Sequence, residues 1–359
     1  MQPLTTVAPP APVVPYQVRL ADVVRDEPEI LRLCQASALH CPPEKYQWNY
    51  AANPLRQAWC SLAIERASQS AVGTTALFPR RILVDGVPFN AAVSGDFAVD
   101  RQHRTLYPAL ALQKAAVTAC RSGCFDILYG FPNDAARRVQ VRAGYRVVGR
   151  LRAGIRPLRI RRTLERSGRK LHRLPGIGIL DSLISLASKE SRVCTPTNYR
   201  YSQLPAFDIR FDRFWMQSLP RHRVVVERSS SYANWRFMSC PSREYSLFAA
   251  VHSVTGEVGG YVLSWSHDGH IHISDIVAHD DAFDGLLTLF IKRQREQGAH
   301  CITVVYFGGS RLVRKIRRFG FVFRSTSSEV LLYTKPELPV AELLSCPDNW
   351  YLFDGDSDF

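Results

Sequence analysis

The sequence predicts an α/β (α+β) protein in which one arrangement of strands and helices occurs twice. First, the stretch 93–148 alternates with period two and then shows apolar residues at helical spacing, which indicates strand, turn, helix, strand and helix. Second, the spacing from Phe131 to Gly144 equals the spacing from Phe307 to Gly320. Third, a chain of 359 residues with 46% hydrophobic content can bury two cores. We therefore expect two domains.

Turn and capping signals divide the first half into elements. Pro28 suits the first turn of a helix, and Asp85-Gly86 suits a hairpin. Gly123 and Gly144 end two helices. The expected elements, in order, are a strand at 16–23, a helix at 27–40, an aromatic loop at 46–53, strands at 58–67, 73–84 and 88–98, a helix at 108–121, a strand at 125–131, a helix at 133–143 and a strand at 146–160. The aromatic loop is either a lid packed on the core or a wall of an acceptor pocket.

The turn before the helix at 108–121 is suited to a phosphate. A helix N-terminus offers unpaired N–H groups and a partial positive charge, and Arg101 and Arg104 lie in the turn. The order Arg104, Tyr107, Ala109 resembles the acyl-CoA pyrophosphate loop of the GNAT acyltransferase superfamily, Arg/Gln-x-x-Gly-x-Gly/Ala. A tyrosine here takes the place of the first glycine.

The helix at 133–143 resembles the second signature of that superfamily, Asn-x-x-Ala-x-x-x-Tyr-x-x-x-Gly-Phe/Tyr. Gln140 stands in the tyrosine position, and the residues on register are Asn133, Ala136, Gly144 and Tyr145. The resemblance covers residues 17–160. It implies two tandem GNAT-like domains, each a mixed, mostly antiparallel twisted sheet flanked by helices.

The resemblance also implies a chemistry, the direct attack of a neutral amine on an acyl-CoA thioester. The co-substrate is then acetyl-CoA or another acyl-CoA, and no metal takes part. The implied cofactor-binding residues are Val99, Arg104, Thr105, Leu106, Tyr107, Ala109, Asn133 and Ala136. Asp96 is the candidate base, and Tyr129 or Tyr107 must supply the proton that Gln140 cannot donate. In the simpler alternatives Asp96 pairs with an arginine and Asn133 only caps its helix.

The second half repeats this order with a different turn. We expect a helix at 208–219, an aromatic loop at 232–237 and 241–245, strands at 246–251, 259–266 and 270–278, a helix at 281–297, a strand at 300–307, a helix at 310–318 and strands at 321–333. The turn contains Asp280, Asp281 and Asp284 and no arginine, so it repels a pyrophosphate. This half resembles the degenerate domain of double-domain GNAT proteins and of Fem-type aminoacyltransferases, and we expect it not to bind CoA.

These patterns divide the chain into five segments. They are a disordered tail at 1–16, an N-terminal GNAT domain with the candidate acyl-CoA site at 17–160, a basic and amphipathic linker at 161–200, a degenerate GNAT domain at 201–335 and an aromatic and acidic tail at 336–359. In the last segment, Trp350 and Tyr351 suggest a docked anchor, and Asp354, Asp356 and Asp358 suggest an acidic end that folds against the arginines.

Charge and cysteine content narrow the function classes. The net charge is +14, and residues 137–173 hold fourteen Arg or Lys against one acid. The basic segment is either a solvated interdomain helix or, through 150–190, a contact with an anionic membrane. Nucleic acid is least favoured because no aromatic platform accompanies the charge. Nine cysteines without a Cys-x-x-Cys pair favour a reducing cytosol over a zinc ribbon or a disulfide framework, and we expect a cytoplasmic protein without a signal peptide or membrane span.

Two further patterns, a pair of histidines and the C-terminal ending, bear on function. His270 and His272 share a strand face after the Asp268-Gly269 turn, and a solvated face accounts for them better than a metal site. The ending resembles GNAT-like proteins of bacterial exopolysaccharide loci. Three hypotheses follow: an N-acyltransferase acting on a small amine, such as an amino sugar or nucleotide-sugar intermediate of envelope polysaccharide synthesis; a Fem-type transferase using charged tRNA; and a non-catalytic GNAT-fold scaffold at the membrane.

Overall fold

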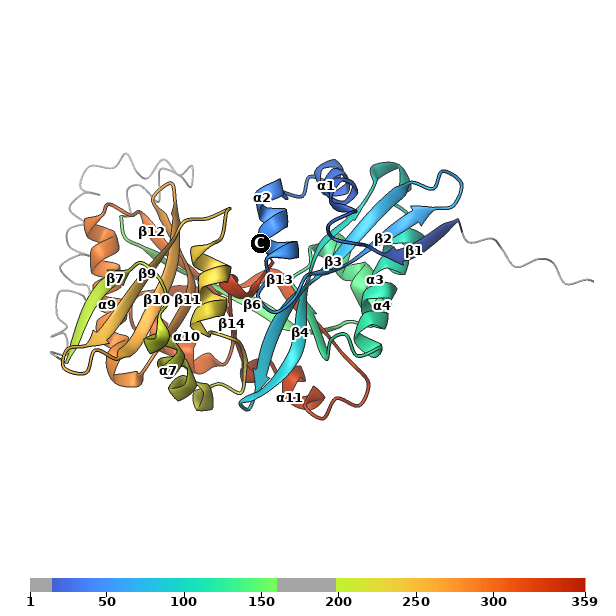
Figure 1. Cartoon of the computed structure of the whole chain (residues 1–359). Helices are drawn as coiled ribbons and strands as arrows, with labels where there is room; N and C mark the ends of the chain where they lie inside the picture. Colours follow the sequence, from blue (N-terminus) through green and yellow to red (C-terminus); the bar gives the residue numbers. More distant parts are fainter. Residues whose placement is uncertain (1–14, 160–197, 359) are drawn as a thin grey trace, which may run out of the picture.

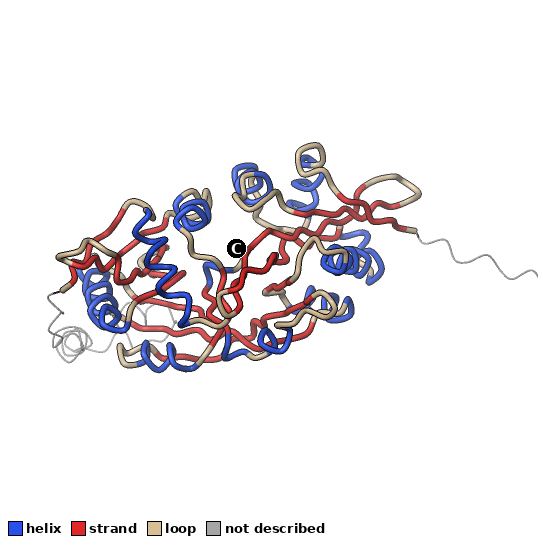
Figure 2. The backbone as a smooth tube through the Cα atoms, turned by 60° about the horizontal axis from the view of Figure 1, so that its bottom comes forward, coloured by secondary structure: helices blue, strands red, loops and turns tan. Residues whose placement is uncertain are grey.

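The protein is described by a computed structural model covering residues 15–159 and 198–358. It shows a mixed α/β fold with strands running through the middle of the molecule and helices on the outside (Figure 1 and Figure 2). The α/β (α+β) class predicted from the sequence is confirmed. Nearly all of the expected tail at 1–16 and the linker at 161–200 lies outside the described residues, as does most of the segment 150–190 expected to contact a membrane.

The first half has the expected order of elements. Its hairpin turn at Asp85-Gly86 has the positive φ angles of a tight hairpin, 47° and 82°. The elements are β1 (Tyr16–Leu20), α1 (Glu27–Ala36), α2 (Pro43–Tyr46), η1 (Gln47–Ala51), β2 (Trp59–Glu65), β3 (Ala71–Val84), β4 (Val87–Val99), η2 (Arg101–His103), α3 (Leu106–Arg121), β5 (Ile127–Gly130), α4 (Asp134–Ala143) and β6 (Arg146–Pro157).

The second half repeats this order and adds a C-terminal extension. Its elements are β7 (Tyr199–Leu204), α7 (Ile209–Ser218), η5 (Leu219–Arg221), β8 (Val224–Val226), α8 (Ser230–Ala233), η6 (Asn234–Met238), β9 (Tyr245–His252), β10 (Val258–His267), β11 (His270–Ala278), α9 (Asp280–Glu296), β12 (Cys301–Gly308), α10 (Ser310–Arg317) and β13 (Val322–Thr334). The extension contains α11 (Ala341–Ser345), η7 (Pro347–Asn349), β14 (Trp350–Phe353) and η8 (Asp354–Asp356). The expected strands at 321–333 are a single long strand, β13.

The aromatic loop expected at 46–53 and the 232–237 part of the second one are largely helical, which corrects the sequence interpretation, whereas residues 241–244 lie outside any helix or strand. Each is a short α-helix that continues into a π-helical turn, η1 or η6. Trp48 in η1 and Trp235 in η6 stack with ring centroids 5.2 Å apart, and each indole N–H donates to the backbone carbonyl of the other, at 2.8 and 3.2 Å. The equivalent turns of the two halves therefore meet face to face at the centre of the molecule.

The strands of both halves form one continuous sheet. Its order is β1-β2-β3-β4-β5-β13-β6-β12-β11-β10-β9-β7. The last strand of the second half, β13, lies between β5 and β6 of the first half. The last strand of the first half, β6, lies between β13 and β12. Each half therefore contributes its final strand to the other half.

The C-terminal extension joins the halves a second time. β14 pairs with β12 and with β8, and β8 pairs with β3. Together with the continuous sheet, these pairs close a ring of eight strands: β3, β4, β5, β13, β6, β12, β14 and β8. The extension is buried as the sequence predicts, since Trp350 is 1% exposed and Leu352 is fully buried.

Candidate functional site

Strand β4 continues beyond the end of its parallel partner β5. The two strands pair from Ala91–Ile127 to Val93–Tyr129, after which β5 ends at Gly130 while β4 continues to Val99. Ligands of open α/β sheets bind at the carboxyl ends of parallel strands. The end of the β4–β5 pairing is therefore the position in the first half where we expect a ligand.

A β-bulge in β4 sets the orientation of Asp96. The β3–β4 register shifts between Thr74 and Ala76, so two residues of β4 face one residue of β3. Asp96 has φ 42°, in the left-handed region that Asp tolerates better than most residues. Bulges often lie beside active sites because they redirect a side chain. Here the bulge directs the Asp96 carboxylate to the face covered by α1 and η1.

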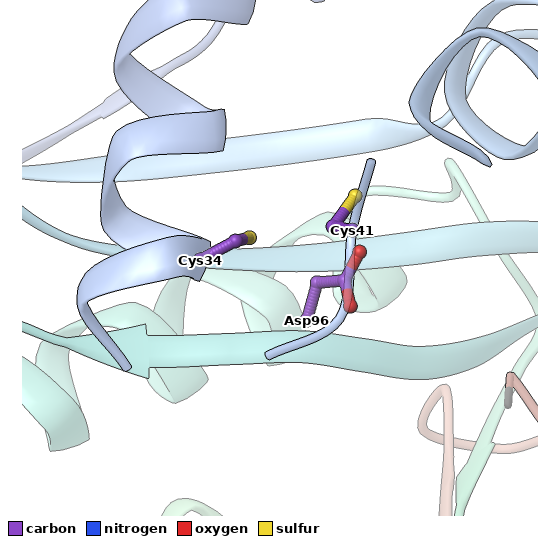
Figure 3. Close-up of side chains that lie close together, drawn as sticks. All are labelled: Cys34, Cys41 and Asp96. Carbon is purple, nitrogen blue, oxygen red and sulfur yellow. The ribbon is translucent and has the colours of Figure 1, made fainter. Parts of the chain in front are cut away.

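The Asp96 carboxylate lies in a largely enclosed polar cluster. Tyr50 in η1 donates its hydroxyl to Oδ2 of Asp96 at 2.9 Å. Burial raises the pKa of Asp96, while the Lys45 ammonium, the Tyr50 hydroxyl and the Cys41 thiol act to lower it. Figure 3 shows Cys34 and Cys41 close to the carboxylate. A carboxylate whose pKa is raised by burial is a better proton acceptor than an exposed one, so Asp96 can act as a general base.

The turn after β4 lies at the surface. Arg104 donates Nε to the carbonyl of Val99 at 3.1 Å, and Asp100 accepts from the backbone N–H of Gln102 at 3.3 Å. Thr105 precedes α3 without a side-chain cap, so the first N–H groups of α3 have no side-chain acceptor there. This uncapped helix start next to an exposed arginine is compatible with a phosphate.

The first residues of α3 divide between surface and core. Leu106 and Tyr107 are each 46% exposed, whereas Ala109 is buried against the sheet. The Tyr107 ring stacks on Tyr16 of β1 with centroids 6.1 Å apart. The structure therefore groups Thr105, Leu106, Tyr107 and Ala109 with Arg104 at the helix start, and it does not bring Tyr107 into the Asp96 cluster.

The second motif has a structural role in α4. The Asn133 side chain caps α4 by accepting from the backbone N–H of Ala136 at 3.0 Å, and Gly144 ends the helix with φ 115°. Gln140 is buried, at 3% exposure. Tyr129 is fully buried and donates its hydroxyl to the carbonyl of Asp356 at 2.9 Å.

The acidic C-terminal segment crosses the middle of the molecule. Asp356 accepts from Nη2 of Arg228 at 2.8 Å, and a side chain at Gly95 would collide with the carboxylate of Asp358. Burial and the neighbouring Asp96 raise the pKa of Asp358 to about 6. The expectation that the acidic end folds against residues 137–173 is wrong, because Asp356 pairs with Arg228 and Asp358 lies beside Gly95. The chain end lies between the two halves (Figure 1, where C marks it).

The corresponding position of the second half is occupied by a strand. Strand β14 pairs with β12 from Tyr306–Phe353 to Gly308–Tyr351, beyond the point where β11 and β12 stop pairing. Tyr351 donates its hydroxyl to the carbonyl of Ile276 on β11. The second half therefore has an added strand beyond the end of its parallel pairing.

The acidic turn of the second half is neutralised by its own cations. Asp280 pairs with Lys315 and, at 3.3 Å, with Arg311, and Asp284 pairs with Arg318 at 3.4 Å. A cavity of about 350 Å³ lies beside this turn. It is lined by residues that include Arg221, His222, Asp280, Phe283, Tyr306, Arg311, Lys315, Asn349 and Tyr351.

The histidines of β11 form no joint site. His270 contacts the thiol of Cys301 at 2.8 Å, and His272 stacks on Trp265 with centroids 4.2 Å apart. Within residues 15–159 and 198–358, the group with metal-ligand geometry is Cys34, Cys41 and Asp96. None of the helices in these ranges is both long enough and apolar enough to cross a lipid bilayer.

Sequence reasoning missed Lys45, Tyr50 and Asp358 as neighbours of Asp96. The alternation of Tyr46, Trp48 and Tyr50 predicts a loop. The structure has a helical turn there instead, and this turn places the Tyr50 hydroxyl within hydrogen-bond distance of Asp96 on β4. Gly95 next to Asp96 is a second signal, because a glycine in a strand often marks a close approach of another segment.

Comparison with known proteins supports the fold. No protein-family profile matches the sequence, and no curated protein is significantly similar to it. Among solved structures, a probable N-acyltransferase from Enterococcus faecalis V583 is similar with a TM-score of 0.64 and 11% identity, over 89% of this chain and 72% of that chain. A GCN5-related N-acetyltransferase from Anabaena variabilis is similar with a TM-score of 0.63 and 13% identity, over 89% and 72%.

A third similar structure is Saccharomyces cerevisiae N-myristoyltransferase with bound myristoyl-CoA, with a TM-score of 0.55 and 12% identity, over 92% of this chain and 83% of that chain. At such identities the likeness shows the fold alone. The chain has a GNAT-like fold, as the sequence motifs imply, and its structural neighbours are N-acyltransferases.

Proposed function

We propose that the chain is an acyl-CoA-dependent N-acyltransferase whose first half performs the transfer. The observation that carries this proposal is Asp96, a partly buried carboxylate on a bulge in β4, beyond the end of its pairing with β5. The GNAT-like fold and the N-acyltransferase neighbours support the same reaction class. The acceptor is an amine, and following the sequence resemblance we propose an amino sugar or nucleotide-sugar intermediate of envelope polysaccharide synthesis.

The reaction divides into three roles. Asp96 accepts a proton from the ammonium of the acceptor, directly or through one water. The neutral amine attacks the thioester carbonyl carbon, the C–N bond forms, and the C–S bond breaks. The departing thiolate takes up a proton, for which Tyr129 on β5 is our candidate because it lies on the same face as Tyr50. Binding at the end of the β4–β5 pairing positions both reactants, which lowers the entropic part of the activation free energy of acyl transfer.

Arg104 and the start of α3 are proposed to hold the pyrophosphate. The exposed guanidinium and the uncapped N–H groups of α3 are compatible with two phosphates. Thr105, Leu106, Tyr107 and Ala109 then contact the cofactor through their backbone, and Val99 supplies the strand end. Asn133 and Ala136 border the pantetheine arm from α4 in this proposal.

Calorimetric titration with acetyl-CoA and longer acyl-CoAs tests the proposal. We expect the wild type to bind at least one thioester and Arg104→Ala to bind it about tenfold or more weakly, because a charge-assisted contact contributes roughly 1.5–3 kcal/mol. Arg25→Ala, which alters another exposed turn arginine, serves as the matched control and should bind normally. A wild-type protein that binds no CoA thioester would exclude the proposed activity.

One observation favours a second candidate, a non-catalytic scaffold. Strand β14 occupies the end of the β11–β12 pairing in the second half, and Asp358 lies against Gly95 near the end of the β4–β5 pairing in the first half. A molecule whose own chain occupies both ligand positions would serve as an adaptor. The same titration distinguishes the two, since an adaptor gives no heat with any acyl-CoA.

A further inference from the structure

Two thiols and one carboxylate meet beside the bulge in β4. The Cys34 Sγ, the Cys41 Sγ and a carboxylate oxygen of Asp96 all lie within 4.8 Å of one another. Figure 3 shows the three side chains converging on one space. Cys34 comes from the last turns of α1, and Cys41 comes from the short connection between α1 and α2.

The two thiols differ in their access to solvent. Cys34 is fully buried, whereas Cys41 is partly exposed and lines an open surface hollow together with Leu39, His40 and Pro42. An oxidant arriving from solvent therefore meets Cys41 first and finds Cys34 directly behind it. A disulfide needs an S–S separation of roughly 2.05 Å, which a small shift of the α1–α2 connection can provide.

Charge decides between a metal site and a dithiol. Two thiolates and a carboxylate are ligands that zinc accepts. However, the Lys45 ammonium already stabilises the Asp96 carboxylate, and Tyr50 already donates to it. A divalent cation at this position would stand next to a fixed positive charge and would compete with that hydroxyl. Hydrogen bonding to Cys41 and burial raise the pKa of Cys34, so the buried Cys34 suits the second, resolving step and the partly exposed Cys41 the first.

We propose that Cys34 and Cys41 are a peroxide-sensitive dithiol that closes to a disulfide beside Asp96. Asp96 accepts the thiol proton of Cys41, and the sulfur attacks one oxygen of hydrogen peroxide. The O–O bond breaks, the leaving hydroxide takes the proton from Asp96 to become water, and Cys41 becomes a sulfenic acid. The Cys34 sulfur then attacks this sulfenic sulfur, the S–S bond forms, the S–O bond breaks, and the Cys34 proton leaves with the oxygen as a second water. Two thiols are oxidised and one peroxide is reduced.

Disulfide formation changes the surroundings of Asp96. The titratable groups that act on this carboxylate or are affected by it are Tyr50, Lys45, Cys41, Cys34, Cys60 and Asp358. In the disulfide, Cys41 has no S–H to donate, so one of the groups that lower the pKa of Asp96 is lost. The pKa of Asp96 therefore rises on oxidation. If the proposed acyl transfer holds, the acidic limb of its kcat/KM profile moves to higher pH in the oxidised protein.

Peptide mass analysis of the full chain tests the proposal. The segment 33–45 contains both cysteines and no internal Lys or Arg, so trypsin releases them in one peptide. After treatment with hydrogen peroxide and alkylation, we expect this peptide to be lighter by two hydrogen atoms and unalkylated. Dithiothreitol should restore two alkylatable thiols.

Cysteine variants test which thiol is oxidised first and which thiol then forms the disulfide. Cys41→Ser should abolish the light peptide, and Cys34→Ala should leave Cys41 as a sulfenic acid that dimedone captures. Cys124→Ser removes an exposed thiol elsewhere and should leave the response unchanged. The proposal is overturned if both thiols of wild-type 33–45 remain alkylatable, if the peptide gains oxygen without forming the link, or if the purified protein carries one tightly bound zinc per chain.

The activity measurement separates this proposal from the proposed function. A reversible shift of the pH profile with peroxide and dithiothreitol supports both. A light 33–45 peptide from a protein that transfers no acyl group supports the dithiol and rejects the N-acyltransferase. If the pH profile of kcat/KM is unchanged in a fully oxidised, active protein, the disulfide does not change the pKa of Asp96 and that part of the proposal is overturned.

Discussion

The two halves share one order of elements but differ in the polar groups at their centres. Aligned on Trp48 and Trp235, Tyr50 of η1 corresponds to Phe237 of η6, and Lys45 corresponds to Tyr232. The first half thus has a hydroxyl and an ammonium near a strained carboxylate. The second half has a phenyl ring in the place of that hydroxyl.

The carboxylates on the bulged strands differ in the same way. Asp96 accepts hydrogen bonds from the Tyr50 hydroxyl, at 2.9 Å, and from the Cys41 thiol, and it has the Lys45 ammonium nearby. Asp275 on β11 is fixed by Arg228 at 2.8 Å and by Tyr261 at 2.7 Å. Similar bulges in β4 and β11 therefore place a carboxylate among different partners, and a buried arginine holds Asp275 but not Asp96.

The sharpest test of this comparison is Asp96→Asn. Asparagine tolerates positive φ and can still accept from Tyr50, so the fold should persist. The variant cannot accept a proton, and we expect kcat/KM for N-acyl transfer to fall by roughly 10²–10⁴-fold. The measurement is a thiol-release assay with an acyl-CoA and an amine acceptor. Asp275→Asn is the matched change in the second half and should reduce stability instead of turnover; the contrast fails if Asp96→Asn keeps full activity.

The next largest effect is expected for Arg228→Met. Arg228 is 3% exposed and pairs with both Asp275 and Asp356, so its removal leaves two buried carboxylates without a counter-charge. Breaking a buried pair in this way costs about 3–5 kcal/mol of the free energy of unfolding. Urea denaturation at pH 7 measures it. Arg213→Met, which removes an exposed pair with Glu257, should cost less than about 1 kcal/mol. Equal losses of unfolding free energy in Arg228→Met and Arg213→Met would contradict a structural role for Asp275.

A pH effect is expected from Asp358 beside the first-half cluster. Its pKa is raised from 3.8 to about 6 by burial and by Asp96, so the folded state binds more protons than the unfolded state between these values. Its contribution to stability is therefore present below about pH 4 and is lost as the pH rises through about 6, by up to about 3 kcal/mol. Asp358→Asn should lack this loss, as urea denaturation at pH 4.5 and 7 would show. Parallel pH dependences of variant and wild type would reject the assignment.

The smallest effect is expected when the first half is made to resemble the second. Tyr50→Phe copies Phe237 and removes the hydroxyl that donates to Asp96. We expect a stability loss of about 1 kcal/mol and a higher pKa for Asp96, because this hydroxyl lowers it. The acidic limb of the pH profile should then move to higher pH. Tyr46→Phe, which removes a hydroxyl that bonds the Val23 carbonyl, should leave that limb in place.

Local features were predictable because they depend on neighbouring residues. The turns Asp85-Gly86 and Asp268-Gly269 have positive φ throughout, and α4 begins at an Asn133 cap and ends at Gly144, all as the sequence predicts. The exchange of β6 and β13 could not be predicted, because strand pairing depends on partners roughly 180 residues apart along the chain. The position of β14 between β12 and β8 is equally non-local.

The candidate site was predictable only in part. Asp96 stood out as a carboxylate on the strand that leads to the helix, and Arg104 as a cation at the helix start. The partners of Asp96 come from a helical turn and from the C-terminal segment, and nothing in the sequence near Asp96 identifies them. The sequence predicts that the acidic end pairs with the largest basic segment. Its buried partner is instead Arg228, which only the topology of the fold brings next to Asp356.

The exchanged strand β13 has a consequence for synthesis of the chain. β13 ends at Thr334 and supplies the neighbour that β5 and β6 need. A ribosome that has made only the first half exposes an unfinished sheet edge, to which other nascent chains can add a strand. Cotranslational completion of the first half therefore waits until β13 has left the exit tunnel, and the interval in between is when a chaperone would be needed.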